Sequence, residues 1–437
     1  MSMEISQIII LLIPTFLFLS FTILLNIYTK NWLHPATFYS LIWFVLIILP
    51  LIFLPNEITS PLGIYWILCT SIAFSAGALL TGSSKKEQKN EKSKKLKEKG
   101  EKIPNKILKQ IRILIITFIS LGIASSLIVL FYQGVSISSL LSLNSYREIT
   151  KTLSLLRYYT SYVPPLISQI LLFTVYLSPL LGGILFSIRK TKRDIILSLF
   201  SVIPAIIVFL LNSTRYPILA SIALWFASYF SFNLYLNKKI KIISKKSIMA
   251  LLIISIFFLL ILSATLSIRI GRVTPSEYLD YQIQTERATV FGYLPAFSSW
   301  FKESYSSIKK PSLGTYTFSG IFDLFKIKKR ISGLYNDYIM IGNDRTNIFT
   351  AHRGLIEDFT LIGSLIFLFL IGLITGYSYS KTKNKNLKFS PILITFYSFT
   401  LLSFIASMLN YNSIILAILA YSLIIFSISK KIQNSPK

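Results

Sequence analysis

Cysteine and histidine, on which many enzymes and secreted proteins depend, are scarce in this sequence. Its 437 residues include one cysteine, Cys69, and two histidines, His34 and His352. A single cysteine excludes a disulfide framework and a cysteine-rich metal site. Because Cys69 lies in an apolar run, we expect its thiol to be buried and inert. The sequence also lacks a glycine-rich phosphate loop and any metal-ligand spacing, so we expect no metal, no cofactor and no reaction driven by ATP or a sugar nucleotide.

Charged residues are scarce as well. They make up 14% of the chain, against roughly a quarter in a typical soluble domain, while 53% of the residues are hydrophobic. A helix needs about 20 apolar residues to cross a bilayer. Eleven apolar runs lie at 5–28, 37–54, 64–81, 113–132, 166–187, 195–211, 216–234, 247–266, 354–379, 390–409 and 412–429. We therefore predict an all-α integral membrane protein of about eleven transmembrane helices, forming a single polytopic domain over residues 1–437.

Clusters of lysine and arginine predict the orientation, because they mark the cytoplasmic ends of spans. Five clusters alternate correctly with the spans, at 83–112, 189–193, 238–246, 381–388 and 430–437. The N-terminus is therefore predicted outside and the C-terminus inside the cytoplasmic membrane. This gives a basic cytoplasmic loop at 83–112, an external loop at 133–165 and a large external loop at 267–353, before the last three spans. We expect loop 83–112 to attract membrane lipids, and no nucleic acid, because no aromatic residue interleaves its charges.

The middle of every predicted span lacks Asp, Glu, Lys, Arg and His. Ion-coupled transporters usually place such residues there, because these groups bind or relay the ion. A lipid-linked oligosaccharide flippase needs a large cationic cavity within the membrane. Both classes are therefore disfavoured.

Arginine is concentrated on the predicted outer side, which holds nine of the twelve arginines but only seven of the 33 lysines. Lysine suffices as a topological charge, whereas the arginine fork suits a bidentate grip on phosphate. The group therefore favours an external phosphate or pyrophosphate ligand, although any single arginine could simply solvate a loop. The candidate substrate-binding residues are Arg215, Arg269, Arg272 and Arg353, with Arg287 and Arg345 as weaker candidates.

His352 is the candidate catalytic base. It lies at the outer mouth of the predicted span 354–379, and imidazole is the usual general base near neutral pH. If the helix begins near Thr350, Glu357 and Asp358 fall within its first turns, where either carboxylate could orient His352 or interact with the positive helix end. The alternative is a histidine that caps or packs the end of the helix.

Two external stretches mix aromatic residues with polar or cationic ones. The segment 316–330 holds Tyr316, Phe318, Phe322 and Phe325 with three lysines and an arginine, and the segment 294–300 ends at Trp300. Either stretch could lie in the membrane interface with its apolar face down. Their aromatic rings could also stack on sugars.

Three stretches together resemble the oligosaccharide repeat-unit (O-antigen) polymerases of bacterial surface polysaccharide assembly. They are Gly292-Tyr-Leu-Pro-Ala-Phe-Ser-Ser-Trp300, Leu313-Gly-Thr-Tyr-Thr-Phe-Ser-Gly320 and Thr346-Asn-Ile-Phe-Thr-Ala-His-Arg-Gly-Leu-Ile-Glu-Asp-Phe359 with Gly363. The third is similar to the family's Thr-Asn-x-Tyr/Phe-Thr-x-x-Arg…Asp-Phe-Gly pattern. Thr360 stands where glycine is common in that pattern. The plan of many spans with one large external loop is similar too.

The resemblance implies a C-type glycosyltransferase-like architecture that uses polyprenyl-pyrophosphate donors without a metal. The expected substrates are polyprenyl-pyrophosphate-linked oligosaccharides, joined at the outer face of the cytoplasmic membrane. Flippase and chain-length regulator proteins are the expected protein partners.

Three other functions remain open from the sequence. The related O-antigen ligases carry Ala-His-Asn at a comparable place, and Ala351-His352-Arg353 departs from that motif at its third residue. A ligase would share the donor and differ only in the acceptor. A flippase or transporter is disfavoured by the uncharged spans, and a purely structural membrane protein would leave the outer arginines unexplained.

Overall fold

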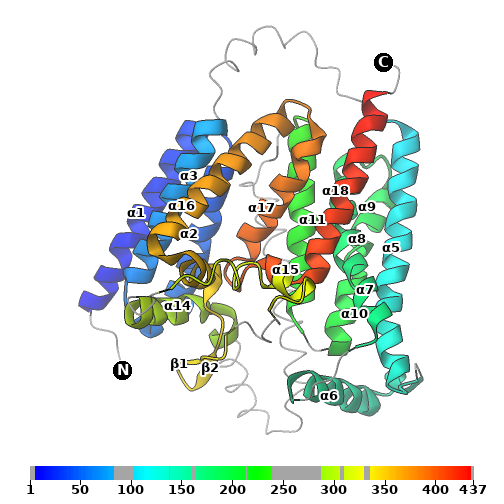
Figure 1. Ribbon diagram of the computed structural model, residues 1–437, viewed down its shortest axis with the longest axis horizontal. Coiled ribbons are helices and arrows are strands. Elements are labelled where there is room, and N and C mark those ends of the chain that lie inside the picture. The colour runs from blue at the N-terminus through cyan, green and yellow to red at the C-terminus, as the bar shows by residue number, and fades with distance from the viewer. Residues whose placement is uncertain are drawn as a thin grey trace. The chain divides into compact units, whose positions relative to one another are not determined.

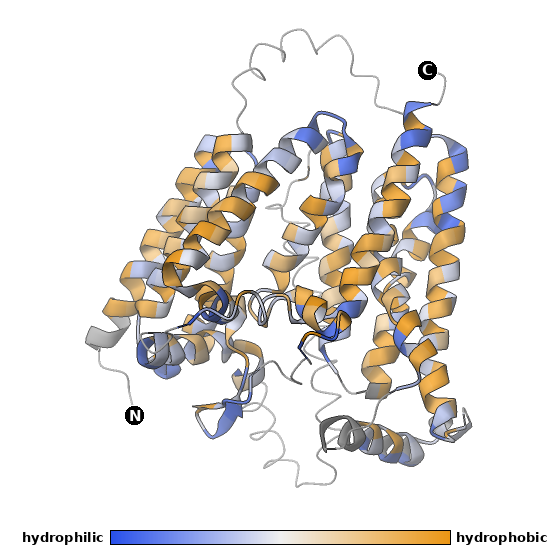
Figure 2. Ribbon diagram, in the orientation of Figure 1, coloured by the Kyte–Doolittle hydropathy of each residue, from blue (hydrophilic) through white to orange (hydrophobic). Residues whose placement is uncertain are grey.

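The computed structural model describes residues 5–82, 103–136, 138–159, 164–212, 214–238, 240, 287–305, 310–328 and 335–434. In this part of the chain nine helices are long and apolar enough to cross a membrane. They overlap nine of the predicted spans, and the predicted span 247–266 lies outside the described residues. Figure 2 shows hydrophobic residues along the long helices and hydrophilic residues near their ends. The predicted class, an all-α membrane protein, is therefore confirmed.

The chain divides into two compact units. Unit 1 comprises Met1–Lys102, Leu234–Asn237 and Gln284–Tyr411, and unit 2 comprises Ile103–Asn233, Lys238–Ile283 and Asn412–Lys437. Unit 1 contains α1 (Ile5–Thr29), α2 (Pro35–Phe53), η1 (Pro55–Glu57), α3 (Leu62–Gly82), α14 (Tyr293–Ser304), α15 (Ser319–Leu324), β1 (Ile339–Ile341), β2 (Asp344–Thr346), α16 (Thr350–Lys383), η4 (Leu387–Phe389), α17 (Ser390–Leu402) and η5 (Met408–Asn410).

In unit 1, α14, α15 and the β1–β2 hairpin lie at the end where α16 begins (Figure 1). The hairpin is antiparallel, with Ile339 opposite Thr346 and Ile341 opposite Asp344. Gly342 takes a φ of +61° at its turn, a conformation that glycine adopts without steric cost. One face of α14 is buried, and α14 packs against both α3 and α16. The 294–300 stretch is therefore part of the protein core and is not the interfacial anchor considered from the sequence.

The backbones of α3 and α16 approach each other through glycines. A Cβ atom added to Gly372 would lie 2.2 Å from the carbonyl oxygen of Phe74, and one added to Gly376 would lie 2.3 Å from that of Ala78. A Cβ on Gly77 of α3 would likewise lie 2.1 Å from the carbonyl oxygen of Phe369. Residues four apart share one helix face. Small residues in such a pair let membrane helices pack closely where lipid removes the hydrophobic driving force.

Helix α16 is bent at Thr360, whose φ of 64° and ψ of −179° interrupt its 34 residues. A straight helix of this length would span about 50 Å, well beyond the roughly 30 Å hydrocarbon core of a bilayer. The helix begins at Thr350, four residues before the predicted span 354–379, so Glu357 and Asp358 do fall within its first turns.

The predicted span 390–409 is too long, because α17 ends at Leu402. The carbonyl oxygen of Ser403 accepts a hydrogen bond of 2.7 Å from the backbone N–H of Ala351. Helix ends leave such groups without intrahelical partners. This bond therefore satisfies one such group at the end of α17 and one at the start of α16, inside an apolar run.

Unit 2 contains α5 (Asn105–Tyr132), η2 (Ser138–Leu141), α6 (Leu143–Tyr159), α7 (Leu166–Leu171), α8 (Phe173–Ile188), α9 (Lys192–Phe200), α10 (Ile203–Asn212), most of α11 (Tyr216–Tyr235) and α18 (Asn412–Gln433). Helix α6 lies within the predicted external loop 133–165. It packs against α10, and the hydroxyl of Tyr146 donates to the carbonyl oxygen of Leu210 at 2.8 Å.

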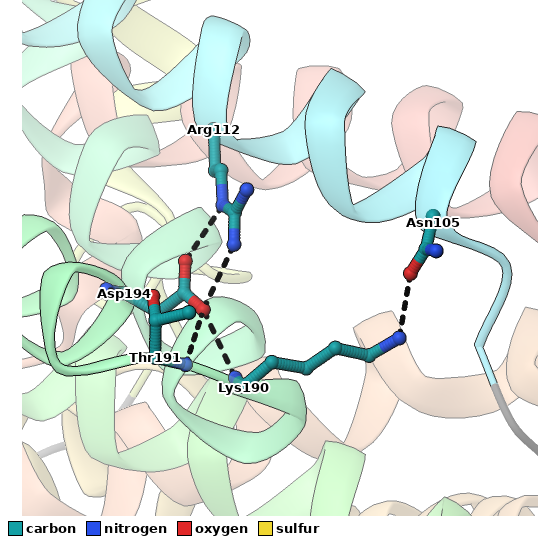
Figure 3. Close-up of polar contacts among 5 residues, drawn as sticks. All are labelled: Asn105, Arg112, Lys190, Thr191 and Asp194. Carbon is teal, nitrogen blue, oxygen red and sulfur yellow. Dashed lines mark hydrogen bonds and ion pairs between the residues drawn. The ribbon is translucent and has the colours of Figure 1, made fainter.

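Asp194 joins the first turn of α9 to α5 (Figure 3). Its carboxylate accepts from Nε of Arg112 at 2.6 Å and from Nη2 at 3.0 Å. The backbone N–H groups of Lys190 and Thr191 also donate to it. Helix α5 begins at Asn105. The last eight residues of the predicted loop 83–112 are therefore helical, and the predicted loop is too long by these eight positions.

Cys69 is exposed, and the prediction that it is buried is wrong. It lies on α3 in one stripe with Ile72 and Leu80, which are also exposed. An apolar side chain in a membrane helix can face lipid as readily as protein. The hydropathy of the run around Cys69 therefore did not predict which side the thiol faces.

The glycine contact between α3 and α16 predicts a large difference between two alanine substitutions in one helix. Gly372→Ala should lower the free energy of unfolding by about 1–3 kcal/mol, the usual cost of overpacking, because its Cβ meets backbone that cannot rotate away. Gly363→Ala is the control, since its Cβ would lie 3.2 Å from the nearest atom, Cβ of Phe359. Unfolding of both variants in detergent gives the comparison. Equal stability of the two would contradict the close contact.

Candidate functional site

The three stretches that resemble the polymerase family meet around the first turns of α16. Within the first stretch, the ring of Phe297 lies 5.9 Å from that of His352, and the ring of Trp300 lies 5.0 Å from the guanidinium carbon of Arg353. The backbone N–H of Leu313, in the second stretch, donates to the carbonyl oxygen of Asp358 at 3.1 Å. Residues separated by 40 or more positions in the sequence thus form one cluster.

Arg353 is the centre of this cluster. Its guanidinium carbon lies 3.9 Å from the ring centre of Tyr335 and 4.2 Å from that of Phe349. Nε donates to Glu357 at 2.9 Å, and Nη2 pairs with Asp337. We call the set of Trp300, Tyr335, Asp337, Phe349, Arg353 and Glu357 the arginine cage. Because two carboxylates face one guanidinium, the cage carries more negative than positive charge.

Three buried polar atoms of the cage have no hydrogen-bond partner within the described part of the chain. They are Nη1 of Arg353, Oε2 of Glu357 and the hydroxyl of Tyr335. Burial raises the pKa of Tyr335 well above its ordinary value, and the negative charge of Glu357 adds to this. Tyr335 is therefore a neutral hydroxyl. The cage thus offers a donor, a carboxylate acceptor and a hydroxyl, which is the complement that a sugar hydroxyl needs.

Asp358 holds the segment 312–317 against α16. Its carboxylate accepts from the hydroxyl of Ser312, from the backbone N–H of Tyr316 at 3.0 Å and from that of Thr317 at 2.6 Å. The adjacent carbonyl oxygen of Glu357 accepts from the backbone N–H of Ser312 at 3.0 Å. Asp358 is fully buried. These contacts occupy both carboxylate oxygens, so the geometry assigns Asp358 to positioning the loop.

His352 lies on the face of α16 that packs against α2 and α3, and it is 1% exposed. Its Nε2 lies 3.0 Å from the hydroxyl of Thr70 and 3.3 Å from that of Tyr39, and its ring meets the edge of Trp43 at 4.4 Å. No hydrogen bond joins it to either carboxylate on α16 in the described structure. Its role as base stays a prediction, and its surroundings match the alternative of a packed histidine.

The remaining predicted arginines have other contacts in unit 1, belong to unit 2 or fall outside the described residues. Arg287 donates to the carbonyl oxygen of Phe53, and Arg345 on β2 lies 4.9 Å from the ring centre of Tyr338. Arg215 belongs to unit 2, between α10 and α11. Arg269 and Arg272 fall outside the described residues. Arg353 is therefore paired with one of the two predicted carboxylates, Glu357, whereas Asp358 contacts the segment 312–317.

Two cage residues, Tyr335 and Asp337, lie outside every stretch singled out from the sequence. They lie 18 and 16 positions before Arg353, just ahead of the hairpin. No spacing or motif distinguished Asp337 from the other acidic residues of the segment 267–353. The fold of the hairpin carries it to the guanidinium.

Thr360, the residue in place of the family's common glycine, lies at the bend that follows Asp358. Its φ of 64° with ψ of −179° belongs to a region that is almost restricted to glycine and costs other residues about 1–3 kcal/mol. The structure therefore supplies a physical reason for a glycine at this position.

Comparison of the chain with protein-family models, with curated proteins and with solved structures finds no match. Among the described residues, no group of three or more His, Cys, Asp or Glu side chains could hold a metal ion.

The backbone strain predicts that Thr360→Gly stabilises the protein. Relief of about 1–3 kcal/mol of strain exceeds the roughly 0.5–1 kcal/mol that glycine costs through its freedom in the unfolded chain. Thr395→Gly in α17 is the matched control, because Thr395 is partly buried in a helix with no positive φ, and it should lose stability. Unfolding of both variants in detergent is the measurement. If Thr360→Gly lost as much stability as the control, the backbone at Thr360 would not be strained and the prediction would be contradicted.

Proposed function

We propose that this protein polymerises polyprenyl-pyrophosphate-linked oligosaccharide repeat units, as a metal-independent glycosyltransferase with a C-type-like architecture and about eleven spans. The growing lipid-linked chain is the donor, and a single lipid-linked unit is the acceptor. The observation that carries the proposal is the convergence of the three family-like stretches on the arginine cage. Flippase and chain-length regulator proteins are the partners such an enzyme works with.

The distribution of basic residues supports an active site on the outer face. In unit 2, Lys190 contacts Asn105 at the start of α5, and Lys431 of α18 contacts Gln110. In unit 1, Lys381 and Lys383 end α16 at the opposite end from Arg353. Each unit thus gathers a basic cluster at one end, as the positive-inside rule requires of a cytoplasmic face, and the cage of unit 1 lies at the other.

The reaction joins an acceptor hydroxyl to the anomeric carbon of the donor sugar. The hydroxyl oxygen forms the new C–O bond, the bond from the anomeric carbon to the pyrophosphate oxygen breaks, and polyprenyl pyrophosphate leaves with the electron pair. The acceptor proton passes to a base. General bases contribute about 10²–10⁴-fold in rate, so a well-placed carboxylate or imidazole is needed.

Glu357 fits this role better than His352. One oxygen of Glu357 is fixed by Nε of Arg353, and the other has no partner within the described residues. Nδ1 of His352 also has no partner within the described residues, but His352 is 1% exposed and enclosed by α2, α3 and α14, and its Nε2 already faces two hydroxyls. The side chain of Glu357 is 14% exposed. Neither assignment involves a metal.

A ligase is the second candidate, because Ala351-His352 is similar to the first two residues of the ligase motif. Such an enzyme would use the same donor and the same base, and would transfer the finished glycan to another acceptor. Cells lacking the protein discriminate the two: single lipid-linked units accumulate without a polymerase, and unattached long chains without a ligase.

The base assignment predicts opposite outcomes for two glutamine variants assayed with synthetic lipid-linked units. Glu357→Gln should lengthen chains about 10²–10⁴-fold more slowly, because glutamine keeps the contact to Arg353 but takes no proton. His352→Gln should stay within about tenfold of the wild type, and Glu303→Gln, an exposed carboxylate on α14, is the control. Full activity of Glu357→Gln with an inactive His352→Gln would return the role to the imidazole.

The pH profile of the wild-type protein gives an independent test. Activity falls as pH drops through the pKa of the base, because only the deprotonated form accepts a proton. An ordinary glutamate titrates near about 4.3 and an ordinary histidine near about 6.5. We expect the fall in rate to lie at the same pH in the wild type and in His352→Gln, because the group that titrates is Glu357 and not the imidazole. A rate that follows imidazole titration in the wild type, and loses that dependence in His352→Gln, would contradict Glu357.

The orientation predicts labelling by an impermeant maleimide in intact cells. In a Cys69→Ser background, a cysteine at Ser306 should react from outside, whereas a cysteine at Ser93 should react only after the membrane is opened. Equal labelling of the two positions would place the cage on the wrong face and remove the proposed function with it.

A further inference from the structure

Five consecutive exposed residues begin at Leu324, the last residue of α15. They are Leu324, Phe325, Lys326, Ile327 and Lys328, which we call the lysine edge. Phe325 and Ile327 are each 69% exposed, and they are flanked by lysines. Large apolar side chains on a fixed surface are costly in water and favourable in lipid. The lysine edge therefore combines a lipid-facing apolar part with a cationic part.

The lysine edge is held in place by the site already described. Backbone N–H groups of segment 312–317 donate hydrogen bonds to the carboxylate of Asp358, and the hydroxyl of Ser319 donates to Asn410 at 3.0 Å. The turn after α15 is closed by a hydrogen bond of 2.9 Å from the backbone N–H of Ile327 to the carbonyl oxygen of Phe322. Lys326 takes a φ of 57° in this turn. Exposure of the apolar residues is thus built into the fold.

A short series of contacts joins the lysine edge to the arginine cage. Nζ of Lys328 lies 3.1 Å from the hydroxyl of Thr315 and 5.2 Å from the ring centre of Tyr316. The rings of Tyr316 and Tyr335 are stacked at 5.6 Å, and Tyr335 lies against Arg353. A phosphate group at Lys326 and Lys328 would therefore place an attached sugar toward the cage.

The charges favour the lysine edge over Arg353 as the pyrophosphate site. Arg353 is already paired with Glu357 and Asp337, so a pyrophosphate there would compete with two carboxylates and lie beside their negative charge. Lys326 and Lys328 are exposed, and the apolar residues between them suit an isoprenoid chain.

We propose that the lysine edge binds the pyrophosphate and the first isoprene units of the lipid-linked donor, leaving the arginine cage to the sugars. This inference rests on the proposed function for the identity of the lipid. It divides the substrate between a cationic, lipid-facing surface and a carboxylate-rich, aromatic one.

The test is binding of undecaprenyl pyrophosphate to the purified, detergent-solubilised chain, followed by native mass spectrometry, with phosphatidylglycerol as the comparison lipid. Lys326→Ser with Lys328→Ser should weaken undecaprenyl pyrophosphate binding about tenfold or more, since a lysine near an anionic lipid headgroup contributes about 1 kcal/mol. Phe325→Ser with Ile327→Ser should weaken it as well. Lys302→Ser, an exposed lysine on α14, should leave it unchanged.

Each outcome bears on the proposal. Undiminished undecaprenyl pyrophosphate binding by the double lysine variant overturns it, and so does an equal loss of phosphatidylglycerol binding, which would make the lysine edge a general anionic-lipid surface. Selective loss supports it. Failure of the proposed function would give a different result. Wild-type protein would then bind undecaprenyl pyrophosphate through the lysine edge and yet extend no synthetic lipid-linked unit. That result would support the binding site and contradict the polymerase function.

Discussion

The close approach of α3 and α16 is the interaction on which the rest of unit 1 depends. Lipid is as apolar as a leucine side chain, so two membrane helices gain little from apolar burial alone and must gain from close packing. Gly77, Gly372 and Gly376 allow backbone to meet backbone. The first turns of α16, before the bend at Thr360, lie against α3 as well: His352 faces Thr70 there, while Arg353 pairs with Glu357 in the arginine cage.

The site that results is more acidic than its arginine suggests. Glu357 and Asp337 flank Arg353, and aromatic rings of Tyr335 and Phe349 cover the guanidinium. A guanidinium placed in this way organises carboxylates and aromatic rings and is poorly suited to receive a phosphate. Cationic side chains exposed beside apolar ones lie instead on the neighbouring lysine edge. The proposed division of the substrate between these two surfaces rests on this separation of charge.

Much of the fold could be predicted because hydropathy and length are local properties. Nine of the apolar runs overlap membrane-length helices in the described part of the chain, and the predicted span 354–379 lies within α16. The extent of α17 could not be predicted, because the residue after its end accepts a hydrogen bond from Ala351, 52 positions earlier, and such a contact has no local signal. The side that Cys69 faces was also out of reach, since lipid and protein interior are equally apolar.

By itself the sequence determined a helical membrane protein, the basic clusters at its span ends and the three stretches worth comparing with a known family. The tertiary structure decided what those stretches do together. It encloses His352 among helices and places Asp337 beside Arg353. Both carboxylate oxygens of Asp358 accept hydrogen bonds from the segment 312–317. Hydropathy acts on each segment separately, whereas hydrogen bonds and ion pairs between distant segments depend on distances that exist only after the helices have packed.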